Sequence, residues 1–339
     1  MHKVVTILLS VLLTSHCALE LHAQSFQNAG SAGAQFLKIG VGARAMGMGG
    51  AYASMDGDVA SLAWNPAGIG TVQQIQLSVQ HTAWVAGLDH NFIGLVVPIT
   101  DQVNLAFHTI YLTSGKIEIT TIDNPEGTGE YYDATDIAAG LTASVRLTSQ
   151  LAFAGTIKYI TERIKDVSSG GVAADAGVQY ATGFRSLALG FTVANIGFEQ
   201  QFSGPSLEVH YQPPDPGEPL AKSELATQQF RLPLLFRASG SFDCFSMFDE
   251  PLEGHKLLLA VDFNQYTDTQ EHLALGTEYS WQGMLSVRSG YVFNADELSW
   301  SLGAGVRVAP GDFQISVDYA ASALGRFGLG HRIGILVGY

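Results

Sequence analysis

The chain has 339 residues, of which 47% are hydrophobic, 14% charged and 10% aromatic, and its formal net charge at pH 7 is −14. With 17 Lys+Arg against 31 Asp+Glu, it lacks the basic surface that binds phosphate backbones, which argues against nucleic acid as a partner. The apolar content argues against disorder. Low charge and 38 Gly, without a long apolar run, are atypical of a soluble enzyme and favour a transmembrane β-barrel.

The first 23 residues have the pattern of a secretory signal peptide, with an apolar stretch at Val4–Leu13 and a small residue, Ala23, at the expected cleavage site. The apolar stretch is too short to cross a bilayer as a helix. Cleavage there would remove Cys17, and His16 in front of that cysteine disfavours the alternative of a lipoprotein. Cys244 would then be the only cysteine, so no disulfide and no zinc cluster are expected.

From residue 72 to the end, apolar and polar residues alternate in segments of about ten, separated by turn residues. A strand with one face toward lipid and the other toward a lumen requires this period of two. In one segment Leu257, Leu259 and Val261 share a face, and Ala260 and Asp262 share the other. The pattern predicts an antiparallel barrel of fourteen strands, at residues 72–85, 90–98, 102–113, 136–147, 150–163, 171–182, 185–196, 227–241, 255–266, 270–281, 283–293, 297–308, 311–320 and 331–339.

Connection lengths support the barrel, because such proteins have short turns at one end and longer loops at the other. The connections predicted after strands three, seven and thirteen, residues 114–135, 197–226 and 321–330, are long. Those at the other end are tight, except residues 242–254, where we expect a short helix or a partner contact. A soluble β-sandwich or propeller is the alternative, because alternation also describes a sheet with one wet face.

Aromatic residues on the apolar face favour the barrel over that alternative. Tyr and Trp collect at strand ends, as interface girdles require. The chain also ends on Tyr339, in phase with the predicted lipid face, which resembles the terminal signal of membrane insertion. The predicted girdle residues are Trp84, Tyr159, Tyr279, Trp281, Tyr291, Trp300 and Tyr319.

Charged side chains of both signs are predicted to face the lumen. In a water-poor lumen each of them needs a partner, so we expect ion pairs rather than an open, wet pore. The predicted lumen charges are Arg146, Lys158, Glu162, Asp175, Arg231, Arg237, Asp262, Glu278, Arg288, Arg307 and Asp318.

Residues 24–71 do not alternate and are rich in Gly and Ala, which predicts a compact hatch with short helices inside the lumen. Arg44, Asp56 and Asp58 are expected to pair with the lumen charges, as structural or gating residues rather than as ligand-binding ones. A Gly-x-Gly-x-x-Ala run at residues 40–45 superficially matches a dinucleotide loop, but no βαβ unit surrounds it.

The hatch segment also resembles a known family. Residues 34–51, which read AQFLKIGVGARAMGMGGA, and the Trp-Asn-Pro-Ala-Gly run at residues 64–68 resemble the PorV/PorQ family of outer-membrane proteins, relatives of the FadL transporters. The Asn65-Pro66 element and a fourteen-stranded barrel with an N-terminal hatch are shared with the FadL group. The resemblance covers roughly residues 30–70 and implies hatch roles for Asn65 and Pro66.

The resemblance implies a non-enzymatic role in type IX secretion at the outer membrane of a Gram-negative-type bacterium. A PorV-like barrel binds secreted cargo through its C-terminal signal domain and passes it to other secretion components. The partner surface would be the long connections at residues 114–135 and 197–226, the second of which is rich in proline.

The alternative is a FadL-like channel that takes up hydrophobic small molecules. The apolar segment 90–98 would support it, with Ile93, Leu95 and Val97 facing inward. Enzyme chemistry is not expected, because the histidines have no metal-ligand spacing and no Ser/His/Asp set is recognisable. Residues 56–58, Asp-Gly-Asp, lack the rest of a calcium loop. No cofactor and no metal are expected. The expected partner around the barrel is the lipid of the outer membrane.

Overall fold

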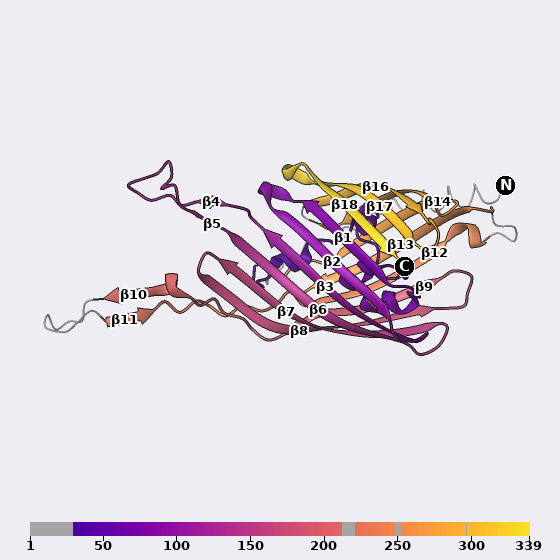
Figure 1. Cartoon of the computed structure of the whole chain (residues 1–339), viewed down its shortest axis with the longest axis horizontal. Coiled ribbons are helices and arrows are strands. Elements are labelled where there is room, and N and C mark those ends of the chain that lie inside the picture. The colour runs from indigo at the N-terminus through magenta and orange to yellow at the C-terminus, as the bar shows by residue number, and fades with distance from the viewer. Residues whose placement is uncertain (1–29, 212–220, 248–251, 296) are drawn as a thin grey trace.

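The computed structural model describes residues 30–211, 221–247, 252–295 and 297–339, so the signal peptide predicted at residues 1–23 lies outside the described part. Fourteen antiparallel strands close into a barrel, which confirms the predicted fold class (Figure 1). In chain order the barrel strands are β1 (Gln76–Ala83), β2 (Asp89–Pro98), β3 (Val103–Thr113), β6 (Ala134–Arg146), β7 (Leu151–Ile164), β8 (Val167–Ala181), β9 (Ala188–Gly197), β12 (Leu235–Asp243), β13 (His255–Tyr266), β14 (His272–Trp281), β15 (Leu285–Phe293), β16 (Leu298–Val308), β17 (Gln314–Leu324) and β18 (Leu329–Gly338).

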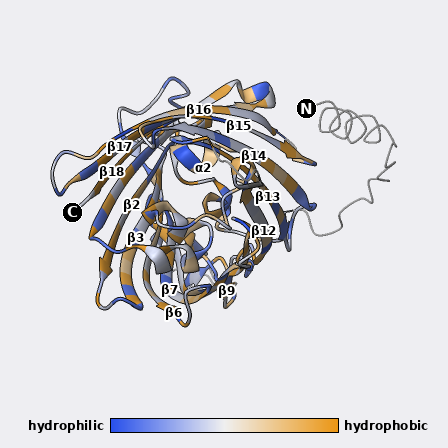
Figure 2. Ribbon diagram, turned by 90° about the vertical axis from the view of Figure 1, so that its right-hand side faces the viewer, coloured by the Kyte–Doolittle hydropathy of each residue, from blue (hydrophilic) through white to orange (hydrophobic). Residues whose placement is uncertain are grey.

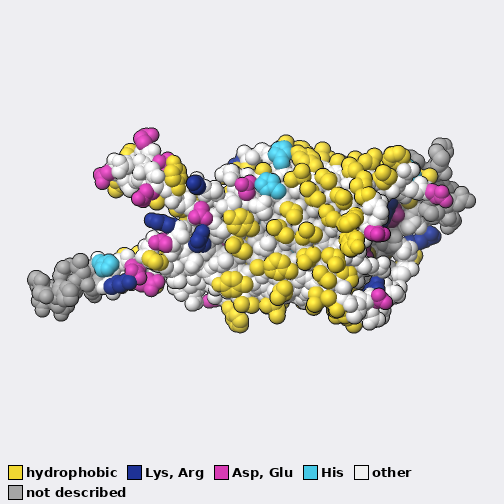
Figure 3. Space-filling view, in the orientation of Figure 1, with side chains coloured by type: hydrophobic (Ala, Val, Ile, Leu, Met, Phe, Trp, Pro, Cys, Tyr) yellow, Lys and Arg dark blue, Asp and Glu magenta, His cyan; other side chains and the backbone are white. Residues whose placement is uncertain are grey.

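The period of two in the sequence becomes the two faces of the wall. On β1, Leu77 and Val79 are about half exposed on the outside, whereas Ser78 and Gln80 are buried in the lumen. The same alternation recurs from strand to strand, so the outer surface carries a broad apolar band (Figure 3). A band of this kind is the lipid-facing surface of a transmembrane barrel. Among the described residues, no helix has the length and apolar character needed to cross a bilayer.

Several strand boundaries differ from the prediction by a few residues, and two of the differences change the connections. The segment predicted at residues 227–241 becomes a barrel strand only from Leu235, because Phe230 pairs with Gln200 of the loop and Arg231 with Ala32 instead. Strand β17 continues to Leu324, so the long connection predicted at residues 321–330 is wrong, and a short 3-10 turn, η7 (Gly325–Phe327), takes its place. Four of the last five residues of β17 are Ala or Ser, and small residues carry no visible alternation.

The orientation predicted for the apolar segment 90–98 is also wrong. Ile93 and Leu95 are exposed on the outer face of β2, and Val97, of the same parity, is partly buried there. Phe92 and Val96 face the lumen and are buried. Both faces of β2 are apolar because one meets lipid and the other meets the hatch.

The two ends of the barrel differ in length of connection. Two hairpins, β4 (Ile117–Glu118) with β5 (Tyr131–Tyr132) and β10 (Glu208–Tyr211) with β11 (Ala221–Glu224), extend from one end, which we call the loop end (Figure 1). The opposite end, the turn end, has short connections and the 3-10 turn η6 (Cys244–Met247) where a short helix was expected. Further 3-10 turns at the loop end are η4 (Val85–Gly87) and η5 (Pro205–Leu207).

Residues 30–71, which we call the hatch, lie inside the barrel (Figure 2). Asp58 and Asn65 cap two of its turns, because their side-chain oxygens accept hydrogen bonds from the backbone N–H groups of Ala60 and Ala67. The elements of the hatch are η1 (Gln35–Lys38), α2 (Ala43–Gly47), η2 (Val59–Ala63) and η3 (Pro66–Thr71).

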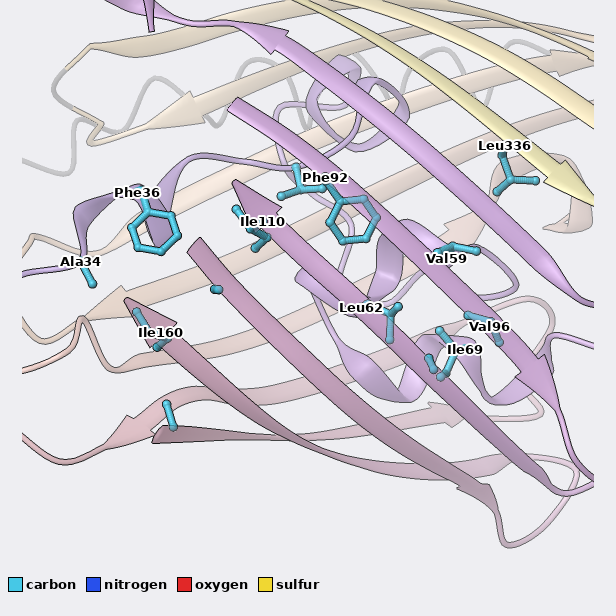
Figure 4. Close-up of a cluster of buried hydrophobic side chains, with 14 of the residues drawn as sticks. Ala34, Phe36, Val59, Leu62, Ile69, Phe92, Val96, Ile110, Ile160 and Leu336 are labelled. Atoms are coloured by element: carbon cyan, nitrogen blue, oxygen red, sulfur yellow. The ribbon is translucent and has the colours of Figure 1, made fainter. Parts of the chain in front are cut away.

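Besides hydrogen bonds from Asn104 to the Ile69 and Val72 carbonyls and from the Ala34 N–H to Glu162, one side of the hatch packs against the wall through apolar side chains. These contacts run from Ala34 and Phe36 near the loop end to Ile69 and Leu336 near the turn end (Figure 4). We call this cluster the apolar seam. Its buried members are Ala34, Phe36, Val41, Val59, Leu62, Ile69, Val72, Phe92, Val96, Ala106, Ile110, Ala138, Ile160, Ala173, Leu232 and Leu336.

Candidate functional site

The other side of the hatch is held by charge. Arg44 of α2 donates from Nε and Nη2 to the two oxygens of Glu278 on β14, at 2.9 and 2.8 Å. Arg288 of β15 donates to Glu278 at 2.5 Å and to Asp318 of β17 at 2.6 Å. All four side chains are largely buried. The chain of paired charges therefore ties α2 to three strands with the geometry of charge-assisted hydrogen bonds.

Asp58 pairs within the hatch rather than with the wall. The Tyr52 hydroxyl donates to its Oδ2 at 2.8 Å, and Arg44 Nη1 lies 3.5 Å from the same oxygen. Burial raises the pKa of the Tyr52 hydroxyl well above its usual value, so it stays a neutral donor. Asp56, predicted to pair with lumen charges, is exposed and has no ion pair among the described residues. Its position two residues before the η2 cap turns it toward water.

Asp262 and Arg237 hold the middle of the hatch by its backbone. The Asp262 carboxylate accepts the N–H groups of Tyr52 and Ala53 at 3.1 and 3.0 Å. Arg237 donates to the Trp64 carbonyl at 2.7 Å, and its guanidinium lies 4.8 Å from the Trp64 ring centre. These two charged wall residues therefore bind the backbone of the hatch and an aromatic ring, and not charged residues of the hatch.

The Asn65-Pro66 element is fixed to β8. The Asn65 amide donates to the carbonyls of Ala53 and Val178, at 2.8 and 3.0 Å, while its oxygen caps η3. The wall residue opposite is Gly177, where a Cβ would collide with the Asn65 side chain and the Pro66 ring. The element therefore needs a glycine-lined wall to lie this close.

Lys158 and Asp175 form a pair that belongs to the wall and not to the hatch. Lys158 Nζ lies 2.8 Å from Asp175 Oδ1 and donates to the Asn195 side-chain oxygen at 2.5 Å. The pairing of β8 with β9 shifts register at residues 174–176, and Asn195 has a positive φ of 65°. The buried pair thus closes an irregular point in the wall.

Arg146 and Arg307 were predicted as lumen charges, and the structure corrects this placement. Arg146 is the last residue of β6 and donates to the backbone carbonyl of Asp101 at 2.5 Å. Arg307 is exposed and donates to the Ser316 hydroxyl at 3.1 Å. Both lie at the turn end, where a side chain on the inward-facing side of a strand reaches water beyond the lumen. Arg231, also predicted inside, is exposed and paired with Glu199 at 2.9 Å.

The sequence analysis missed two buried charges. Asp268 is 3% exposed and pairs with Lys38 of the hatch at 2.6 Å, and Arg332 of β18 is 1% exposed. Its neighbour Ile333 and the next residue of that parity, Ile335, face lipid, so alternation alone would have placed Arg332 in the lumen. Trp84 was predicted for the outer girdle, but its ring lies 5.4 Å from the Arg332 guanidinium. Trp84 therefore belongs to the inner wall.

In the ranges that the structure describes, no group of three or more His, Cys, Asp or Glu side chains is arranged to hold a metal ion. Tyr339 lies at the turn end, where its backbone N–H and carbonyl pair with Ile75. Its side chain is 63% exposed and its ring lies 4.8 Å from that of Phe313. A role for Tyr339 in membrane insertion stays a prediction.

Comparison with known proteins places this geometry in one fold. No protein-family model and no curated protein matches the sequence. Among solved structures, the CymD monoaromatic hydrocarbon channel matches with a TM-score of 0.56 at 13% identity, over 88% of this chain and 97% of that one. The Ralstonia pickettii toluene transporter TbuX matches with a TM-score of 0.54 at 11% identity, over 88% and 97% of the two chains.

A Pseudomonas aeruginosa FadL homologue also matches, with a TM-score of 0.54 at 11% identity, over 88% of this chain and 98% of that one. The chain has a FadL-like barrel fold. At these identities the likeness concerns the fold alone. The FadL-related part of the resemblance seen in the sequence fits these findings, whereas membership of PorV/PorQ is not shown by them.

Proposed function

We propose that the protein is an outer-membrane channel for hydrophobic small molecules, closed in this structure by its hatch. The observation that carries the proposal is the apolar seam, a continuous strip of buried apolar side chains along the lumen from loop end to turn end. Contact with such a strip does not stabilise a polar solute. A hydrocarbon, in contrast, can make the apolar contacts with the wall that the hatch makes in the closed state. Structures of the same fold include a monoaromatic hydrocarbon channel and toluene transporters.

The loop end offers a place of first contact. A groove of about 480 Å³ lies at the base of the β4–β5 hairpin, and its wall is mainly apolar. Ile119, Tyr132, Ile164, Val167 and Phe202 line it. Long connections of outer-membrane barrels lie outside the cell, so we place the groove on the external side. A groove of this size suits a small hydrocarbon.

Contacts lead from this groove to the seam. The Phe202 ring lies 5.5 Å from the Phe230 ring, measured between centres. Phe230 in turn packs on Gly33, where a Cβ would collide with its ring. Ala34, the next residue, is the first member of the seam. The route we propose therefore runs from the groove, past Phe230, and along the seam.

A disulfide across the seam tests the route. A Cβ on Gly94 of β2 would lie 2.6 Å from Val59 Cγ1 of the hatch, so cysteines at these two positions are within disulfide reach. In a Cys244→Ser background, V59C/G94C should lose most toluene uptake by whole cells when oxidised and regain it on reduction. The two single-cysteine variants serve as controls. Undiminished uptake by the oxidised protein would show that the seam is not the route.

A second candidate function is binding of a secreted protein, which the resemblance of residues 34–51 to PorV/PorQ implies. The observation in its favour is the pair of hairpins beyond the membrane band, near which Ile122 and Phe198 are 101% and 85% exposed. Replacing residues 208–224 by a short turn leaves the pairing of Gln200 with Phe230 in place. Loss of co-purified secreted protein with unchanged toluene uptake would support this candidate, and unchanged co-purification would remove it.

A further inference from the structure

Two carboxylates face each other inside the barrel near the loop end. Asp136 of β6 and Glu162 of β7 are direct cross-strand partners with partly buried side chains. The Glu162 Oε1 atom accepts the N–H of Ala34 in the hatch at 3.1 Å, and the Ser169 hydroxyl of β8 lies 3.5 Å from Oε2. Like charges on directly opposed residues destabilise a sheet, and the effect is stronger where water is excluded.

Within the described ranges, no basic side chain forms an ion pair with either of these carboxylates. Elsewhere in the lumen such groups are compensated, and Glu278 alone pairs with two arginines. Arg163, which follows Glu162 in the sequence, faces outward and pairs with the exposed Asp133 at 3.2 Å. When Asp136 and Glu162 are both ionised, they therefore place two negative charges side by side that a cation from outside the chain can compensate.

A buried amide adjoins the two carboxylates. Gln200, in the connection after β9, is 3% exposed, and its Oε1 and Nε2 have no hydrogen-bond partner in the described part of the chain. Its segment pairs with β8 on both sides of this residue. Its Nε2 lies 2.8 Å from the place of a Cβ on Gly171, the next inward position of β8 after Ser169. The side chain therefore crosses the inner face of β8 toward β7, where Glu162 is the cross-strand partner of Ser169.

Wall, connection and hatch meet at this place. Gln200 and Phe230 exchange two backbone hydrogen bonds, at 2.8 and 2.9 Å. The carbonyl of the residue after Phe230 accepts the Gly33 N–H at 2.9 Å, and the N–H of the next hatch residue, Ala34, is the one bound by Glu162. A ligand shared by Glu162 and Gln200 would therefore hold the first residues of the hatch to the rim of the barrel.

We propose that Asp136, Glu162 and Gln200 form a calcium site at the loop end of the lumen. Two carboxylates and an amide oxygen are the hard donors that Ca²⁺ prefers, and water completes its coordination. Half a turn of the Gln200 amide brings Oε1 to the place of Nε2, since neither atom has a partner that holds it.

A divalent cation matches the two charges of the site. Ca²⁺ is favoured over Mg²⁺, because Ca²⁺ accepts the irregular geometry of donors from three separate segments, whereas Mg²⁺ demands a near-ideal octahedron. With only two carboxylates we expect a Kd of about 0.1–1 mM, the range of extracellular calcium modules. Cation binding does not depend on what the proposed channel carries.

Isothermal titration calorimetry tests the site, with calcium chloride as the probe. The full-length barrel, purified in detergent and treated with EDTA, should bind one Ca²⁺ in the presence of physiological NaCl, and Mg²⁺ at least tenfold more weakly. Asp136→Asn and Glu162→Gln should each lower the Ca²⁺ affinity at least tenfold. Gln200→Glu, which adds a third carboxylate, should raise it at least tenfold. Glu297→Gln, at an exposed pair with Arg326, is the control and should bind as the unmodified protein does.

Thermal unfolding gives a second readout and shows that the variants fold. In EDTA, Asp136→Asn should melt above the unmodified protein, because it removes the repulsion from Glu162. Added Ca²⁺ should raise the Tm of the unmodified protein, since a ligand that binds only the folded state stabilises it. The same addition should leave the Tm of Asp136→Asn unchanged.

Several results would overturn the calcium site. These are no saturable Ca²⁺ binding by the unmodified protein, undiminished binding by a folded Asp136→Asn, or the same rise of Tm in that variant as in the unmodified protein. Equal affinity for Mg²⁺ would reject the choice of calcium, and unchanged affinity in Gln200→Glu would reject Gln200 as a ligand. If Glu162→Gln fails to fold because it loses the Ala34 contact, Asp136→Asn decides.

Discussion

The two sides of the hatch are attached to the same barrel by different forces. Toward β14, β15 and β17, Arg44 reaches a buried network through Glu278, with charge-assisted bonds of 2.8 and 2.9 Å. Toward β2, β3 and β6, Val59, Leu62 and Ile69 pack on apolar wall residues, and the uncharged amide of Asn104 donates hydrogen bonds to two backbone carbonyls. Paired charges have one good geometry, whereas apolar contacts are non-directional. The charged side therefore fixes the position of the hatch, and the seam side is the one that can open at lower cost.

Disulfides that fix each side of the hatch to the wall in turn should have the largest effect on uptake. On the charged side, a Cβ at Gly47 would lie 3.2 Å from the Gly303 Cα, and the reverse distance is 3.1 Å, within reach of a disulfide after a small shift. In the Cys244→Ser background, oxidised G47C/G303C should keep toluene uptake within twofold of its reduced form. The seam lock V59C/G94C should lose most of it.

The single variants G47C and G303C control for packing changes at these glycines. Equal loss of uptake in both locks would mean that the hatch moves as one body, and the distinction between its sides would fail.

Removal of the central carboxylate should have the next largest effect. Glu278→Gln leaves Arg44 and Arg288 buried beside each other without their shared counter-charge. Breaking a buried pair in this way costs about 3–5 kcal/mol of the free energy of unfolding. Denaturant unfolding in detergent measures it, and planar-bilayer recordings should show raised conductance as α2 loosens. Glu297→Gln, at an exposed pair with Arg326, is the control and should show no resolvable change. If Glu278→Gln is as stable as the wild type, the ion-pair network does not contribute to holding the hatch.

A smaller effect is expected where hatch and wall backbones touch. A Cβ at Gly290 of β15 would collide with the Met48 carbonyl and the Gly49 nitrogen, so only glycine allows the approach. Gly290→Ala should destabilise the barrel by about 1–3 kcal/mol, the usual cost of overpacking. Gly155→Ala is the matched control, because the nearest atom to its Cβ is 3.9 Å away. Equal melting temperatures for the two variants would contradict a tight contact at Gly290.

The fold could be predicted most accurately from the sequence in segments where the side chains are large. Alternation of bulky apolar and polar residues predicted the fourteen-stranded barrel, but it gave no signal in the Ala- and Ser-rich end of β17. It also could not orient β2, because a strand between lipid and an apolar hatch is apolar on both faces. The correct orientation depends on Val59 and Leu62, which lie in another part of the chain.

The parity of a residue along a strand indicates whether its side chain faces the lumen. It does not indicate which residue the side chain pairs with or how far along the barrel it lies. Arg44 and Glu278 are 234 positions apart, so no spacing rule connects them. Arg288 and Arg307 both have inward parity on neighbouring strands, yet one is in the network and the other at the rim. Depth along the barrel depends on strand boundaries, and these were the least accurate part of the prediction. Arg332 was missed although parity alone would have placed it inside.

The pair of arginines gives the smallest expected effect and the sharpest test of depth. Arg307 is exposed at the turn end and its guanidinium has no ion pair among the described residues, donating to the Ser316 hydroxyl, so Arg307→Gln should change the free energy of unfolding by no more than about 0.5 kcal/mol. Arg288→Gln removes the cation that Glu278 and Asp318 share, which leaves buried carboxylates beside each other, so it should resemble Glu278→Gln. Because both substitutions are identical in chemistry and parity, the difference between them measures the burial and the ion pairing that come with depth in the barrel. A large loss in Arg307→Gln would place that guanidinium in the lumen network after all.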